Sequence, residues 1–285
     1  MGKLVNTSRV QFSKNQHSAG AQAAGLWYSL FRAAGNPPAD TVLGAGTNLA
    51  FQALTRTTSG AAGIQHGADV GARAGATKKI TAASVLTAAA TTAPFSLMLV
   101  DLLGFYTITS VTVDTAQTLD NTVTLPRFTN GKGVQAFITP STVMGAATPN
   151  ITLGYTNSAG TAAKATPAVL PAGLTQAPVG SIIHSGTGAG KYGPFIPLAQ
   201  GDDGIRSVDS LTLSATYVSG VLNLVLCKPI LTISATTLGV KVREEYADGA
   251  RPEIADGACL SVLMLAGVNT PANSTVFGEL ELAWE

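Results

Sequence analysis

The clearest pattern in the sequence is a period-two alternation of apolar and polar residues that starts near residue 95. Short runs rich in Thr, Val, Ile and Leu, separated by Gly, Pro and Asn clusters, are typical of β-strands. We therefore expect strands within 106–114, 121–128, 133–140, 205–234 with a turn at Ser219 and Gly220, 259–267 and 276–285, and a hairpin over 150–165.

Many short strands at close spacing, with few helices between them, favour an all-β fold. We expect residues 94–285 to form a β-sandwich body of jelly-roll type. A nucleotide-binding α/β fold would need long helices between the strands, and the pattern contains none after residue 95.

The first 93 residues have a different character, because Gly and Ala dominate and no strand period is sustained. This part predicts an extended arm with one short helix near 19–34, which Gly35 and the following prolines end. The apolar residues at helical spacing in this stretch are Leu26, Trp27, Leu30 and Phe31.

Charge separates the two parts further. Residues 1–80 carry eight Lys and Arg against Asp40 and Asp69, which gives +6, and residues 81–285 carry nine against fourteen acids, which gives −5. A basic leader of small residues on an acidic body predicts an arm that lies along an acidic neighbour, with a partly ordered tail as the alternative. Nucleic acid is the weaker partner because the basic residues are scattered.

Only 12% of the residues are charged and 46% are hydrophobic, so we expect much of the surface to be covered by other subunits. We expect a homo-oligomer, with three copies as the predicted number.

Two sets of residues are predicted to contact a partner. The arm set combines apolar anchors with cations that would meet acidic rims: Leu26, Trp27, Leu30, Phe31, Arg9, Arg32 and Arg56. The acidic set could receive a basic arm or a calcium ion, or could be a solvated loop: Glu244, Glu245, Asp248, Glu253 and Asp256.

Candidate catalytic and ligand motifs fail on their spacing. Around Lys191 the glycine-rich loop has Ser185 where a phosphate loop needs glycine, and Tyr192 where it needs a short hydroxyl. Asp202 and Asp203 read as a turn before a strand more simply than as a calcium loop. The three histidines lack ligand spacing, so we expect no enzyme activity, no metal and no cofactor.

Cellular context follows from three further features. Cys227 and Cys259 lie in apolar runs and are expected to be buried thiols rather than a disulfide. The N-terminus lacks an apolar signal region, and the apolar segment 94–106 contains Asp101 and is too short to span a bilayer. We expect synthesis in a cytoplasm and no membrane contact.

Four phrases between Leu97 and Ile233 resemble structural proteins of tailed bacteriophages: LPRFTNGKGVQAFITPS, ITLGYTNSAGTAAKATP, FIPLAQGDDGIRSVDSLTLSAT and LNLVLCKPI. The resemblance implies a virion component assembled in the host cytoplasm, most similar to a capsid decoration or cement protein. Such a protein would bind the major capsid protein and bridge its neighbouring subunits without catalysis.

Three alternatives remain open at this point. A receptor- or glycan-binding fibre or spike protein is the first, and the major capsid protein itself is the second, although the expected long spine helix is missing after residue 95. A glycan hydrolase of the virion is the third, and it has the least support because aromatic residues that could line a sugar site are scarce.

Overall fold

The computed structural model describes residues 6–15, 23–67, 69, 77–87, 92–122, 124–170, 177–186, 188–270 and 274–284. These residues form strands and contain no helix, which confirms the all-β prediction. None of them forms a helix long and apolar enough to cross a membrane. The strands are β1 (Asn6–Asn15), β2 (Trp27–Ser29), β3 (Gly35–Asn36), β4 (Phe51–Ala53), β5 (Lys78–Thr87), β6 (Phe95–Ile108), β7 (Gln117–Thr118), β8 (Gln135–Thr142), β9 (Ile151–Asn157), β10 (Lys164–Ala165), β11 (Ile205–Leu213), β12 (Val221–Ala235), β13 (Val242–Glu245), β14 (Glu253–Ile254), β15 (Leu260–Ala266) and β16 (Thr275–Trp284).

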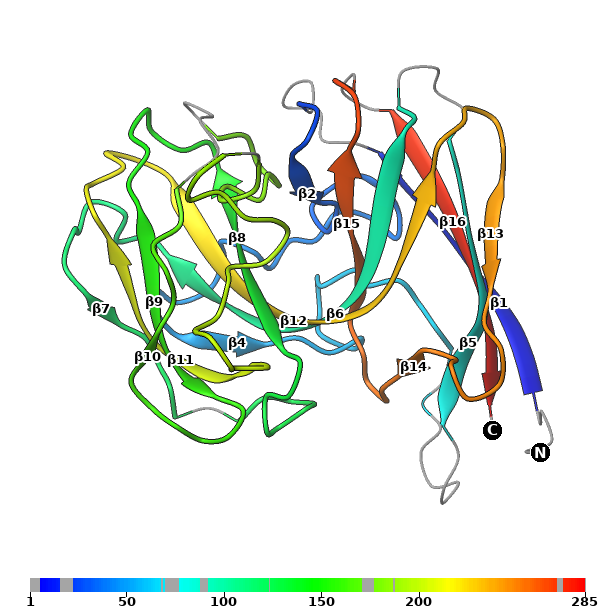
Figure 1. Ribbon diagram of the computed structural model, residues 1–285, viewed down its shortest axis with the longest axis horizontal. Helices are drawn as coiled ribbons and strands as arrows, with labels where there is room; N and C mark the ends of the chain where they lie inside the picture. The colour runs from blue at the N-terminus through cyan, green and yellow to red at the C-terminus, as the bar shows by residue number, and fades with distance from the viewer. Residues whose placement is uncertain are drawn as a thin grey trace.

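The strands belong to three sheets. The terminal sheet has the order β13-β5-β16-β1-β3, with β14 also paired to β5. The central sheet has the order β2-β15-β6-β12-β8, with β4 also paired to β6, and the distal sheet has the order β10-β9-β11-β7. The long strands β6 and β12 run through the middle of the molecule, with the distal sheet on one side and the terminal sheet on the other (Figure 1).

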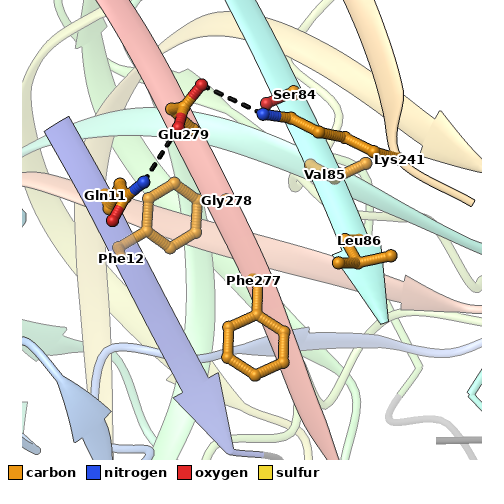
Figure 2. Close-up of a pocket in the computed structure, with 9 residues that line it drawn as sticks. All are labelled: Gln11, Phe12, Ser84, Val85, Leu86, Lys241, Phe277, Gly278 and Glu279. Atoms are coloured by element: carbon orange, nitrogen blue, oxygen red, sulfur yellow. Dashed lines mark hydrogen bonds and ion pairs between the residues drawn. The ribbon is translucent and has the colours of Figure 1, made fainter. Parts of the chain in front are cut away.

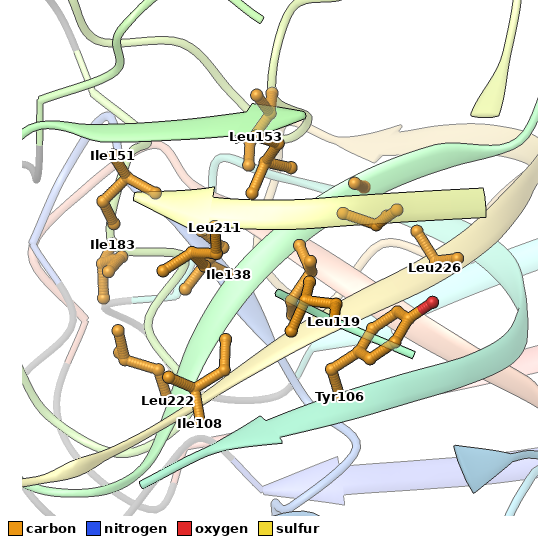
Figure 3. Packing of buried hydrophobic residues seen from close by; sticks show 14 of the residues in the cluster. Tyr106, Ile108, Leu119, Ile138, Ile151, Leu153, Ile183, Leu211, Leu222 and Leu226 are labelled. Atoms are coloured by element: carbon orange, nitrogen blue, oxygen red, sulfur yellow. The ribbon is translucent and has the colours of Figure 1, made fainter. Parts of the chain in front are cut away.

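One face of the central sheet therefore serves two cores. Leu97 and Leu99 of β6 pack in a cluster with residues of the terminal sheet, and Tyr106 and Ile108 pack in a cluster with residues of the distal sheet. The pairing of β6 with β12 shifts by one residue at Leu103, and this shift keeps the apolar side chains on the same face across the junction. We call the two halves the terminal lobe and the distal lobe (Figure 3 shows the distal core).

The opposite face of the central sheet is covered by chain from the first 93 residues. Phe31, Leu43 and Leu54 pack there against Val100 and Phe105. Because the central sheet is buried on both faces, most of β6 reads as a continuous apolar run rather than an alternation.

The N-terminal part corrects two predictions. Its described residues are folded into the sheets rather than extended from them, since β1 and β5 both pair with β16, and β2 pairs with β15. The helix near 19–34 is not seen: Trp27–Ser29 is a strand, and residues 19–22 lie outside the described residues. Leu30 and Phe31 enter different cores, as consecutive residues of extended chain do, so the helical spacing of the apolar residues was misleading.

The strands predicted from alternation are largely confirmed after residue 133. Strands β8, β12, β15 and β16 and the β9–β10 hairpin lie where the pattern placed them. The strand predicted over 121–128 is wrong, because its described residues form no strand, and Arg127 is instead buried in an ion pair with Asp101. The strand predicted over 106–114 ends at Ile108, and β11 and β12 belong to different sheets although one turn joins them.

Candidate binding surface

The outer face of the terminal sheet carries a row of polar contacts across its strands. On β16, Leu280 and Leu282 point into the core, so Glu279 and Glu281, which alternate with them, point outward. Glu279 accepts hydrogen bonds from Gln11 Nε2 at 2.9 Å and from Lys241 Nζ at 3.1 Å (Figure 2). These hydrogen bonds hold the pKa of the Glu279 carboxyl below its usual range.

A second row runs parallel to the first. Arg243 of β13 reaches Glu281 with two hydrogen bonds, of 2.6 Å and 2.9 Å, and its Nε lies 3.0 Å from Glu245. Arg9 of β1 lies 3.2 Å from the same Glu281 carboxylate. The bidentate contact with Arg243 lowers the pKa of Glu281, so this carboxylate stays ionised and the two rows together are electrically balanced.

A shallow hollow of about 230 Å³ adjoins these rows. Its apolar side is formed by Leu86 and by Phe277, which is 42% exposed, and its polar rim includes Lys241 and Glu279 (Figure 2). Gly278 is required here because a Cβ at this position would overlap the ring of Phe12 on the neighbouring strand. An exposed aromatic ring bordered by balanced ion pairs is suited to contact with another protein surface.

The predicted apolar anchors lie in the protein's own cores. Leu30 and Phe31 are fully buried, and Leu26 and Trp27 are partly buried against the same clusters. They therefore stabilise this chain and, in this structure, offer no continuous surface to a partner.

The three predicted cations are also separated from one another. Arg32 donates to the carbonyl of Leu43, and Arg56 lies 3.3 Å from Asp69. Only Arg9 lies on the outer face of the terminal sheet.

The acidic set lies along the edge of the terminal sheet, on β13, on β14 and in the turns beside them. Its members meet cations or a phenol of the same chain: Glu245 with Arg243, Glu244 with Tyr246, Asp248 with Arg251, and Glu253 with Lys79 at 3.9 Å. Asp256 lies close enough to Lys78 to oppose the fall in the pKa of that amine. Across the part of the chain that the structure describes, no group of three or more His, Cys, Asp and Glu could hold a metal.

The glycine-rich loop holds its acidic pair by polar contacts. Asp202 accepts hydrogen bonds from Tyr155 Oη at 2.6 Å and from Asn157 Nδ2 at 2.7 Å, and these bonds lower its pKa. Asp203 accepts a hydrogen bond from Ser158. Tyr192 bonds through its backbone amide to His184, so the loop is tied to the distal lobe.

A buried ion pair joins the two lobes, and sequence reasoning missed it. Arg127 meets the Asp101 carboxylate with Nε and Nη2 at 2.8 Å and 2.7 Å, and Nη2 also donates to the carbonyls of Leu54 and Leu102. Asp101 accepts a further bond from the Cys259 amide at 2.9 Å. A lone Asp within the apolar run of β6 was the signal that could have revealed it.

A buried amine and imidazole form a second unexpected pair, in the terminal lobe. The Lys78 amine donates to His66 Nδ1 at 2.8 Å, and His66 Nε2 donates to the Ala258 carbonyl at 2.9 Å. Lys78 also lies over the Trp284 ring, 5.8 Å from its centre. Burial lowers the pKa of both groups, which keeps His66 neutral.

Two further buried polar side chains are satisfied by the backbone. Lys14, which shares the inward face of β1 with Phe12, donates to the carbonyls of Ala33 and Pro38 at 3.1 Å each, and burial lowers its pKa to about 8. His184 accepts from the Ile138 amide and donates through Nδ1 to the Tyr192 carbonyl, so it is neutral, and burial lowers its pKa to about 4.

Comparison with known proteins gives little likeness. No family model matches the chain, and no curated protein matches it. Among solved structures, the VP2 subviral particle of infectious bursal disease virus is 9% identical, with 99% of this chain and 81% of that chain covered and a TM-score of 0.17. A point mutant of the same VP2 protein, in T=1 particles, is 10% identical, with 99% and 78% covered and a TM-score of 0.16. Such TM-scores do not establish a shared fold.

Proposed function

We propose that this protein is a structural component of a bacteriophage virion that binds the capsid and bridges neighbouring copies of the major capsid protein, without catalysing a reaction. The phrase-level resemblance between Leu97 and Ile233 suggests the virion, and the low charge content suggests extensive contact with other subunits. The jelly-roll topology remains part of this proposal. The predicted number of three copies does not, because the open edge of β1 described below favours a pairing of two copies.

The observation that carries the bridging role is a pair of exposed apolar clusters, one in each lobe. The distal cluster contains Val113, Val143 and Val218, of which Val218 is 75% exposed and Val143 is 51% exposed. Backbone hydrogen bonds from Tyr217 to Val111 and from Gly145 to Ser219 hold these loops together.

The second cluster lies at the terminal sheet and contains Leu238, Val240 and Phe277. Gly239 bonds to Thr87, and Thr87 pairs with Val276, so the loop lies beside the start of β16. The chain before β12 and the chain after it lie toward opposite ends of the long axis of the molecule (Figure 1).

Strand β12 sets the distance between the clusters. Val218 precedes it, Leu238 follows it, and its 15 residues span up to about 50 Å. Two separate apolar surfaces on one ordered strand allow a molecule to contact two neighbours at once, which is the geometry that a bridging protein needs.

Cosedimentation with purified capsids of the source phage tests the proposal. We expect Val143→Ser with Val218→Ser, and Leu238→Ser with Val240→Ser, each to weaken capsid binding at least about tenfold, since each pair removes apolar contact area at one end. Leu170→Ser is the matched control, because Leu170 is an exposed apolar residue outside both clusters. Undiminished binding by both double variants would contradict the bridging role.

One observation favours the receptor-binding alternative. A hollow of about 570 Å³ on the distal lobe is bordered only by polar side chains, and it includes Thr156, Arg206 and Ser207 from β9 and β11. Hydroxyl, amide and guanidinium groups can hydrogen-bond a sugar. Glycan binding that Arg206→Ala abolishes, with no capsid binding, would favour a fibre or spike protein.

A further inference from the structure

Strand β1 has one edge that is only partly used. It pairs with β16 along all ten residues, but on its other side β3 covers only Ser13 and Lys14. Among the described residues nothing pairs with the edge of 7–12 on that side, and the short strand β3 is the next strand beyond β1 in this sheet.

A hydrogen bond at the C-terminal end of β1 shows which residues direct their backbone groups toward the open edge. The amide of Asn15 donates to the Ala34 carbonyl at 2.8 Å, so odd-numbered residues of β1 direct their backbone groups away from β16. Thr7, Arg9 and Gln11 therefore present their N–H and C=O groups on the open edge.

This edge lacks the features that usually prevent strand pairing. The stretch NTSRVQFSKN contains no Pro or Gly, and its register with β16 has no shift that would mark a bulge. Its one exposed cation, Arg9, is 70% exposed but already faces Glu281. Val10, on the inner side, is only partly buried against the core of the terminal lobe, so a neighbouring strand would complete its packing.

We propose that the occupant of this edge is β1 of a second copy of this chain, paired antiparallel about a twofold axis at Arg9. The open window of 7–11 is symmetric about residue 9, so Thr7 faces Gln11 of the partner and the two Arg9 residues face each other. This register forms about six backbone hydrogen bonds and ends before β3 begins.

Electrostatics permit the approach of an identical edge. The outer face beside β1 carries Arg9, Lys241 and Arg243 against three carboxylates in direct contact with them, so it has no net charge to repel a second copy. The two facing Arg9 side chains are each held by their own Glu281. The pairing is independent of the virion role, since it needs no capsid.

Cysteine cross-linking tests the register. In a hydrogen-bonded antiparallel pair the facing Cα atoms are about 5.5 Å apart, which suits a disulfide, whereas two Thr7 residues would be about 14 Å apart. Under mild oxidation Arg9→Cys should cross-link to a covalent dimer at least about tenfold faster than the matched control Thr7→Cys. The native Cys227 and Cys259 are buried and should not contribute. Equal rates would overturn the proposed pairing.

Light scattering after size exclusion tests the edge itself. Gln11→Pro removes an outward N–H and leaves the ladder to β16 intact, so it should convert the dimer to a monomer, whereas Gln11→Ala, which loses the same side chain, should stay dimeric. An unchanged far-UV circular dichroism melt shows that the variant is folded. A wild-type monomer or trimer, or a folded Gln11→Pro dimer, would overturn the proposal.

Discussion

The distal and terminal lobes share β6 and β12 but are built from different material. The distal core is one continuous apolar cluster, mostly aliphatic but with Tyr106, Tyr155 and Tyr217, and it is supplied by residues between Leu103 and Leu226. The terminal lobe brings together β1, β5 and β16 from distant parts of the chain, and it buries Lys14, His66 and Lys78 beside its apolar residues. Both lobes have an apolar core, and the distal lobe also buries His184, but only the strands of the distal lobe follow a simple apolar alternation.

The difference shows how buried polar groups can be accommodated in a small-residue core. Strand β5 buries Ala82, Ala83 and Ser84 as well as Ile80 and Val85. Small side chains leave the backbone close to its neighbours, and carbonyls such as that of Ala33 are then available to the buried amines. The distal lobe, packed with larger aliphatic residues, gains its stability from apolar burial.

The largest effect should come from the ion pair between the lobes. Arg127→Leu leaves the Asp101 carboxylate buried without its partner, which should lower the free energy of unfolding by about 4 kcal/mol. Urea denaturation measures this loss in the free energy of unfolding. The double variant Asp101→Asn, Arg127→Leu removes the buried charge and keeps an acceptor for the Cys259 amide, so it should recover part of the loss. A double variant as unstable as the single one would show that the charge is not the cause.

Acidification should have the next largest effect, through the buried histidines. The pKa of His184 is lowered to about 4 in the folded protein, so between pH 6.5 and 4 only the unfolded chain takes up its proton. The contribution of neutral His184 to the free energy of unfolding is complete above pH 6.5. It should fall by about 3 kcal/mol as the pH drops to 4. His66 in the terminal lobe acts in the same direction, since its pKa is also lowered.

Urea denaturation between pH 7.5 and 4.5 checks this dependence. His184→Gln should reduce the slope of the free energy of unfolding against pH. His66→Gln should reduce the same slope independently. If the slope of neither variant differs from that of the wild type, the carboxyl groups rather than the histidines control acid stability.

A smaller effect tests whether the lobes unfold together. Ile151→Val in the distal lobe and Ile80→Val in the terminal lobe each remove one buried methylene, which should cost about 1 kcal/mol. Because β6 and β12 pass through both cores, each variant should shift the whole thermal transition. A calorimetric trace that splits into two transitions, with only one shifted, would mean that the lobes are independent.

The smallest effect should come from the exposed ion-pair rows. Arg243→Ala removes both bonds to Glu281 at the surface, where water and salt screen them, so stability should change little. Thermal melts at low and high salt measure the difference, with Lys164→Ala as a control on the other lobe. A large loss of thermal stability that persists at high salt would show that these ion-pair rows stabilise the fold.

The distal lobe was largely predictable from sequence because its strands are half-exposed and alternate. In β9 the residues Ile151, Leu153 and Tyr155 are buried while those between them are not, and the pattern revealed both strand and face. The terminal lobe was not predictable in this way. Its strands β1 and β5 are rich in Ser, Thr, Ala and Asn, so apolar contrast is weak, and their pairing partner β16 is remote in sequence.

The candidate surface was predictable only in part. Arg9 and Glu245 were named from charge, and they do lie on the same two-row network. The residues that join them, Glu281 and Arg243, could not be selected, because a cross-strand contact depends on register, which sequence alone does not supply. The exposed cluster of Leu238, Val240 and Phe277 likewise depends on how a loop folds back beside a strand.

The position of β16 between β1 and β5 has a consequence for synthesis of the chain. Gln11 and Glu279 make contact across a separation of 268 residues, so during translation β1 and β5 both wait for a central partner that leaves the ribosome much later. We expect the distal lobe to be able to condense before β16 is synthesised, and the terminal sheet to close only after β16 has emerged from the ribosome. Until then β1 has two unpaired edges instead of one, and this nascent stage is when a chaperone would be most useful.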